Sequence, residues 1–426
     1  MTARARWRVV WAACAAAACV VTAACGGGGR PSAVGTPGAA GTGGSATPGG
    51  QASPTGSGAT QSATAPDSAA PGGGDPASAS ASACVTQVLG SLTLAQRVGQ
   101  LFLVAVDGNK ASELGAAEHT YHFGSVLLNK SAAGTAALAV QTTALQELAA
   151  SGTGGVGFFI AANQEGGEIQ QLTGRGFATM PTELEQGTWT TARLRTAAAG
   201  WGTDLRAAGV NLDLAPVMDV VPAASAAGNA PIGALDRDYG SDPAVNGEHG
   251  AAFIEGMASA GVMSVAKHFP GLGRVTGNTD FTANVVDNVT TADDPYLNSF
   301  RGAVGAGVPM VMVASATYTK IDPTQLAAFS PAVMRLLRDG LGFTGVIVSD
   351  DLGDAVAVQS VTPGNRAVRF LSAGGDLVTS QSLAPAEQMA AAVLARASGN
   401  AAFRATVDDA ALRVLDAKQA AGLLSC

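Results

Sequence analysis

Two short strings carry polar groups suited to catalysis, and each directly follows a short apolar run. Lys267 and His268 begin the string KHFPGLG after the run Val262–Ala266, and the string SDDL, which contains Asp350, follows the run Gly345–Val348. In α/β barrels the active site lies at the carboxyl ends of the strands. The two strings therefore predict an active site that contains a carboxylate able to act as a nucleophile.

Further polar residues follow other apolar runs in the same manner. Asn163, Gln164 and Glu165 follow one run, and Asp219 trails the next. Each has a plainer alternative, since Glu165 before two glycines suits a helix cap and Asp219 suits a turn. His268 likewise suits a packed, hydrogen-bonded ring.

Lys267 and Asp350 are the residues hardest to explain by structure alone. A lone lysine in an apolar run is excluded from a core unless its ammonium group meets a polar ligand or a carboxylate.

The segments that must position these residues alternate between β-type and helical patterns of apolar residues. Short apolar β-type runs recur with Ala/Leu-rich segments of helical spacing between them, which predicts a closed parallel (β/α)8 barrel of the TIM type. A doubly wound open sheet is the alternative, but no G-x-G-x-x-G follows the first run. The eight runs are 101–106, 124–128, 157–162, 210–215, 262–266, 308–314, 345–348 and 375–379, and the helical segments include 136–150, 190–208, 246–260 and 331–339.

The chain begins with segments that do not belong to this barrel. Residues 1–24 have a basic start and an apolar run that ends before Cys25 in VTAAC, which predicts a lipoprotein signal peptide and lipid attachment at Cys25. A transmembrane anchor is the alternative, but the run is shorter than the roughly 20 residues needed to span a bilayer. Residues 25–83 are almost wholly Gly, Ala, Ser, Thr and Pro and predict a disordered linker. We expect an exported protein, held by lipid on the outer face of a bacterial cell membrane.

Composition limits what the remaining body, residues 84–426, binds. The chain carries a net charge of −8, which argues against nucleic acid as a partner. Only Cys84 and Cys426 remain after the signal and Cys25, so a disulfide between the two ends of the body is the simplest expectation, with two free thiols as the alternative. No zinc or calcium ligand spacing is present, and we expect no metal and no cofactor.

Five strings together resemble the N-terminal barrel domain of glycoside hydrolase family 3, and within it the single-domain bacterial β-N-acetylglucosaminidases. They are NQEGGEIQQL, NLDLAPVMDV, LDRDYG, KHFPGLG and FTGVIVSDDL, and the resemblance extends from Leu92 to Leu424. It implies that Asp350 is the nucleophile and that Lys267, His268 and Arg237 contact sugar hydroxyls. We also expect Asn163 and Asp219 to bind substrate.

Three departures from the family pattern concern the acid/base and the sugar pocket. The family follows KHFPGHG with an Asp-Ser-His triplet whose histidine is the acid/base, whereas this chain has Leu272 and then Asn278-Thr279-Asp280. Asn163 stands where an aspartate is usual, and Gln171 where an arginine is common.

Two hypotheses follow from these departures. In the first, the chain is an exo-acting retaining glycosidase that removes β-linked N-acetylhexosamine from cell-wall (peptidoglycan) fragments, with Asp280 as the proton donor. In the second, it is a surface lipoprotein that binds sugar or wall polymer and turns over poorly or not at all.

Overall fold

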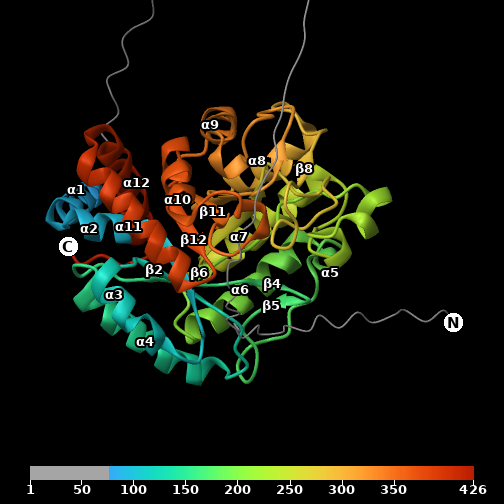
Figure 1. The fold of residues 1–426 in the computed structure, drawn as a ribbon. Coiled ribbons are helices and arrows are strands. Elements are labelled where there is room, and N and C mark those ends of the chain that lie inside the picture. Colours follow the sequence, from blue (N-terminus) through green and yellow to red (C-terminus); the bar gives the residue numbers. More distant parts are fainter. Residues whose placement is uncertain (1–75) are drawn as a thin grey trace, which may run out of the picture. The chain divides into compact units, whose positions relative to one another are not determined.

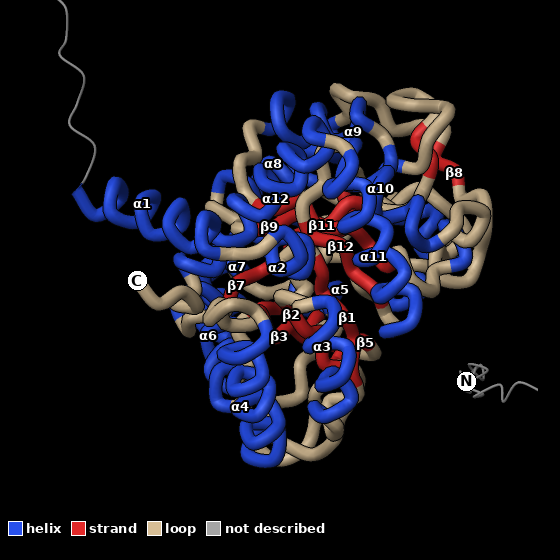
Figure 2. Tube along the Cα trace, turned by 60° about the vertical axis from the view of Figure 1, so that its left-hand side comes forward, coloured by secondary structure: helices blue, strands red, loops and turns tan. Residues whose placement is uncertain are grey.

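A closed barrel of parallel strands forms the centre of the protein. The computed structural model describes residues 76–426. Within this range eight strands close in the order β1-β12-β11-β9-β7-β6-β3-β2, and Figures 1 and 2 show helices placed around them. The barrel strands are β1 (Phe102–Val106), β2 (Ser125–Leu128), β3 (Phe159–Ala162), β6 (Leu212–Asp213), β7 (Met263–Phe269), β9 (Met310–Val313), β11 (Val346–Asp351) and β12 (Leu377–Ser380).

The strands form because their residues are apolar on both faces. Every residue of β1, β2, β3, β9 and β12 is buried, as expected where the barrel interior lies on one side and a helix layer on the other. Each of the eight predicted runs overlaps one barrel strand, so the barrel prediction is confirmed. Closure of the sheet excludes the doubly wound alternative.

Helices connect the successive strands and cover the outside of the barrel. They are α3 (Gly115–Tyr121), α4 (Thr135–Gly152), α6 (Thr191–Ala207), α7 (Pro243–Ser259), α8 (Asn298–Gly305), α9 (Pro331–Arg335), α10 (Pro363–Ala373) and α11 (Leu383–Gly399). The predicted helical segments are found, with one difference. The segment 331–339 changes after Arg335 into a π-helical turn, Leu336–Gly340.

Three further helices gather where the strands begin: α1 (Pro76–Ser91), α2 (Leu94–Gly99) and α12 (Ala401–Ala420). Cys84 of α1 and Cys426 form a disulfide with a Cα–Cα distance of 5.8 Å. The α1 helix begins at Pro76, so its first turns fall inside the segment for which we expected no structure. Proline favours the first position of a helix, because that position needs no backbone N–H donor.

The polar residues of the two key strings lie within the last residues of β7 and β11 rather than after them. The β7–β9 register shifts between Ala266 and Phe269, and the β11–β12 register shifts between Val348 and Asp351. Such irregularities change the direction in which side chains point, and they are common beside active sites. Here they coincide with the positions of Lys267, His268 and Asp350.

The signal peptide, Cys25 and most of the predicted linker lie outside the described residues. None of the helices in 76–426 has the length and apolar character that a membrane span requires.

Candidate active site

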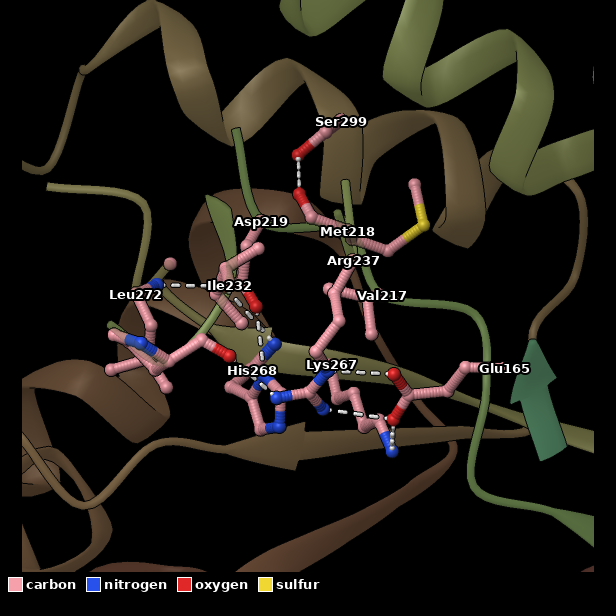
Figure 3. A network of polar contacts seen from close by, with 12 residues as sticks. Glu165, Val217, Met218, Asp219, Ile232, Arg237, Lys267, His268, Leu272 and Ser299 are labelled. Carbon is pink, nitrogen blue, oxygen red and sulfur yellow. Dashed lines mark hydrogen bonds and ion pairs between the residues drawn. The ribbon is translucent and has the colours of Figure 1, made fainter. Parts of the chain in front are cut away.

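A buried carboxylate held by two cations occupies one side of the barrel mouth. Glu165, in the short strand β4 (Gln164–Gly166), is 1% exposed. Its Oε2 accepts from Arg237 Nε at 2.7 Å and its Oε1 lies 2.6 Å from Lys267 Nζ, a convergence visible in Figure 3. Burial alone would raise the pKa of Glu165, but the charges of Arg237 and Lys267 outweigh it and lower the pKa to about 2. Glu165 is therefore an ionised counter-ion and not a helix cap.

The cations keep part of their hydrogen-bonding capacity for a ligand. Lys267 Nζ donates to Glu165 and, at 2.9 Å, to Asn163 Oδ1, which uses two of its three N–H groups. Arg237 uses three of its five on Glu165 and the carbonyl of Pro231. At least one N–H of Lys267 and two of Arg237 thus have no acceptor among the described residues.

His268 is oriented from behind by a buried aspartate. Asp219 is 0% exposed and its Oδ2 lies 2.7 Å from His268 Nδ1, while its Oδ1 accepts from the backbone N–H of Leu272 at 2.6 Å (Figure 3). The Asp219 carboxylate already accepts hydrogen bonds from backbone N–H groups, so it acts as an acceptor toward His268 as well. The ring proton of His268 therefore lies on Nδ1. Nε2 of His268 then has no partner among the described residues and is available to a substrate hydroxyl.

The two adjacent carboxylates at the end of β11 have different surroundings. Asp351 accepts four backbone N–H groups at 2.8 to 3.0 Å, from Gly353, Asp354, Ala355 and Gln381, which makes it the cap of the loop. Asp350 accepts one bond, from the N–H of Asp351 at 2.9 Å. Asp350 is therefore the carboxylate of this pair that keeps an oxygen for chemistry.

The loop that carries Asp280 is tied to the loop after β11. The carbonyl oxygens of Asp280 and Thr279 accept from the backbone N–H groups of Val356 and Ala357 at 3.1 and 3.0 Å. Asn278 Oδ1 accepts from the backbone N–H of Asp280 at 2.9 Å, so the Asn278 side chain supports the backbone of this turn. The loop tip is thus held next to the loop that follows the nucleophile candidate.

The carboxyl of Asp280 has a raised affinity for its proton. Asp280 as a whole residue is exposed, although its carboxyl group is largely withdrawn from solvent. This burial, followed by the nearby carboxylates of Asp350 and Asp351, raises the pKa of Asp280 to about 6, against the opposing charges of His268 and Arg237.

Two further acids beneath the site were not predicted from sequence. Asp213 and Glu183 are 0% and 1% exposed, and burial raises the pKa of both well above the usual range. Asp213 Oδ2, Glu183 Oε2 and the Tyr239 hydroxyl lack partners among the described residues. Asp213 had a signal, since it is a lone acid within the apolar run Val210–Ala215. Glu183 had none, because its contact with the Val217 N–H depends on the fold.

The mouth also contains an open depression beside the ends of β1, β2 and β12. Its volume is about 560 Å³ and its lining includes Asp107, Asn129, Lys130, Gln381 and Ser382. The described residues contain no group of three or more His, Cys, Asp or Glu side chains placed to hold a metal ion.

The chain belongs to glycosyl hydrolase family 3, since the model of the family's N-terminal domain matches residues 93–417. The beta-hexosaminidase LpqI of Mycobacterium tuberculosis is 32% identical over 292 residues, covering 66% of this chain and 71% of that protein. The resemblance inferred from the five strings is confirmed. The protein is accordingly a glycoside hydrolase.

Solved structures agree with this assignment. A beta-N-acetylhexosaminidase from Beutenbergia cavernae superposes with a TM-score of 0.76 at 47% identity, over 77% of this chain and 99% of that one. A family 3 beta-N-acetylglucosaminidase from a Paenibacillus species gives a TM-score of 0.70 at 28% identity, over 78% of this chain and 63% of that one.

Proposed function

We propose that this protein is an exo-acting, retaining β-N-acetylhexosaminidase that works on cell-wall fragments. Asp350 attacks the anomeric carbon while Asp280 gives its proton to the oxygen of the leaving group. The glycosyl ester on Asp350 is then cleaved by water, and Asp280 takes a proton from that water. Lys267, Arg237 and His268 hold the sugar hydroxyls so that the ring faces the nucleophile.

The observation that carries this proposal is that the neighbouring carboxyls of Asp350 and Asp280 have different surroundings. Asp350 has a free oxygen, and it helps to raise the pKa of Asp280. Two carboxyls whose surroundings separate their proton affinities are the usual acid and nucleophile of a glycosidase. Asp219 acts through His268, which it orients, and Asn163 acts through Lys267.

The wall-fragment substrate rests on the predicted location. Attachment of lipid to Cys25 and the long polar linker would hold the barrel outside the cell, where wall glycans are accessible. Two or more acyl chains on such a cysteine anchor a protein stably to a membrane, whereas a single chain does not.

A panel of aryl β-glycosides of N-acetylglucosamine, glucose and xylose tests the proposal. We expect sustained hydrolysis of the N-acetylglucosaminide and little of the other two. A burst that then stalls would mean that Asp350 works without a competent acid/base. Absence of any release from all three would favour the sugar-binding lipoprotein instead.

A further inference from the structure

One short helix contacts each of the three chain segments that carry the charged cluster of the site. This charged cluster consists of Glu165 in β4, Lys267 in β7 and Arg237 in the connection between β6 and α7. The helix is α5 (Glu183–Gln186), which is a single turn. So short a helix is not stable by itself, and its place is set by its contacts with the rest of the protein.

The buried acid of α5 binds the backbone that lies beside Lys267. Glu183 is 1% exposed, and its Oε1 accepts from the N–H of Val217 at 3.0 Å. Val217 in turn forms a parallel bridge with Lys267 (Figure 3). The N–H of Lys267 donates to the carbonyl of Pro216 at 3.1 Å, and the N–H of Met218 donates to the carbonyl of Lys267 at 2.6 Å. Glu183 therefore holds the segment against which Lys267 is aligned.

Two other residues of α5 bind the segments that carry Glu165 and Arg237. Gln186 is 0% exposed, and its Nε2 donates to the backbone carbonyl of Glu165 at 2.9 Å. The backbone N–H of Leu184 donates at 3.2 Å to the carbonyl of Asp236, which directly precedes Arg237. All three members of the charged cluster are thus connected through one helical turn.

The end of α5 is packed closely against the chain that follows Arg237. A Cβ atom at Gly187, the residue directly after the helix, would lie 2.1 Å from the carbonyl oxygen of Tyr239. Only glycine permits so close an approach of two backbones. Because packed interiors transmit displacements, a shift of α5 would also move the Arg237 segment.

The carboxyl group of Glu183 lies near the charged cluster. Burial, followed by the nearby Glu165 carboxylate, raises the pKa of Glu183 well above its usual range, against the Val217 N–H and the charges of Arg237 and Lys267. The Val217 N–H needs only an acceptor oxygen, which a carboxylic acid and an amide both provide. A glutamine in place of Glu183 would therefore serve the same contact.

We propose that α5 is the positioning element of the sugar site, in which Glu183 and Gln186 act through Lys267 and Glu165. The inference rests on the proposed function, which assigns Lys267 to the sugar hydroxyls. A buried ion pair keeps its strength only with close geometry, and Lys267 Nζ lies 2.6 Å from Glu165 Oε1. Glu183 and Gln186 hold the backbones on the two sides of this pair, so they fix that separation.

Calorimetric binding of N-acetylglucosamine measures the consequence for the sugar. Glu183→Ala should weaken the affinity about tenfold, because Lys267 no longer meets the sugar in its aligned position. Glu183→Gln keeps the acceptor oxygen and should bind within about twofold of the wild type. Glu185→Ala, an exposed change on the same helix, is the matched control and should bind as the wild type does. Wild-type affinity in Glu183→Ala, or an equal loss in Glu183→Gln, would refute the positioning role.

A double-mutant cycle with Lys267→Met separates positioning from general support of the fold. If Glu183 acts through Lys267, adding Glu183→Ala to Lys267→Met should weaken sugar binding by less than about twofold. Losses that multiply would show that Glu183 acts independently of Lys267, and they would overturn the inference.

Crystal structures of the variants give a readout that needs no ligand. The contact between Lys267 Nζ and Glu165 Oε1 should be lost in Glu183→Ala and in Gln186→Met, which removes the donor to the Glu165 carbonyl, and it should be kept in Glu185→Ala. An unchanged contact in Glu183→Ala and Gln186→Met overturns the inference, whatever the activity. If the contact responds as expected but the wild-type protein hydrolyses no aryl glycoside, the glycosidase proposal fails and the positioning role stands.

Discussion

The acidic side chains of the site differ in pKa because each has different charged neighbours. Glu165 has a pKa lowered by Arg237 and Lys267, whereas burial raises the pKa of Asp213 and of Glu183 well above the usual range. The two cations face the carboxylate of Glu165, and the charge of Asp219 also acts on Arg237.

Asp280→Ala tests the acid at the scale of one residue. Hydrolysis of substrates with poor leaving groups should fall at least about a hundredfold, and hydrolysis of activated aryl glycosides should fall much less, because only the former need a proton. Added azide should restore release of the activated ones. Asp293→Ala, an exposed aspartate on the same connection, serves as the control.

The pH profile gives a second readout of the same group. The first step needs protonated Asp280, whose pKa is raised to about 6, so the rate on poor leaving groups should decline as the pH rises through about 6. The decline should vanish in Asp280→Ala. Equal losses on both substrate classes would remove Asp280 from the mechanism.

At the scale of elements, the loop after β11 is built around the Asp351 carboxylate. Both oxygens accept pairs of backbone N–H groups, which fixes the direction of the chain immediately after Asp350. The same loop binds the tip of the Asp280 loop through Val356 and Ala357. The relative position of Asp350 and Asp280 is therefore set by two loops that are joined by backbone hydrogen bonds.

Asp351→Asn should disturb this loop, because an amide nitrogen would face two N–H donors. We expect the free energy of unfolding to fall by about 2 to 3 kcal/mol, together with a loss of activity. Denaturant unfolding measures the first effect. Asp409→Asn, an exposed change on α12, should stay within about 0.5 kcal/mol of wild type. Wild-type stability and activity in Asp351→Asn would contradict the assigned role.

The eight strands were predictable from sequence because their apolar runs are continuous and bounded by helical segments. Lys267 and Asp350 were predictable because polar groups at the ends of such runs are conspicuous. The role of Asp351 as a loop cap and the contact of Glu183 with Val217 were not, because both depend on backbone groups brought together by folding.

At the scale of the whole molecule, the ends of the body are joined to the base of the barrel. Lys418 of α12 is fully buried and donates to Gln100 Oε1 at 2.7 Å and to the carbonyls of Gly124 and Gly157 at 2.5 and 2.8 Å. Three acceptors match the three N–H groups of an ammonium ion. The Cys84–Cys426 disulfide adds a covalent link at the same end.

The disulfide closes a loop that spans the body, so its loss should be costly. Chain-entropy models give about 5 to 6 kcal/mol for so long a loop, as an upper value. Cys84→Ser should lower the unfolding midpoint, and mass spectrometry of the unreduced protein should show no alkylation at either cysteine. Two thiols that react in the folded protein would refute the bridge.

The identity of the nucleophile is the central claim, and covalent trapping tests it most directly. A fluorinated N-acetylglucosaminyl fluoride should form a stable glycosyl ester, and peptide mapping should place the sugar on Asp350. Asp350→Asn should fold normally and remain unlabelled. A sugar found on Asp351 or Asp354, or hydrolysis of aryl substrates without any trapped ester, would contradict the account.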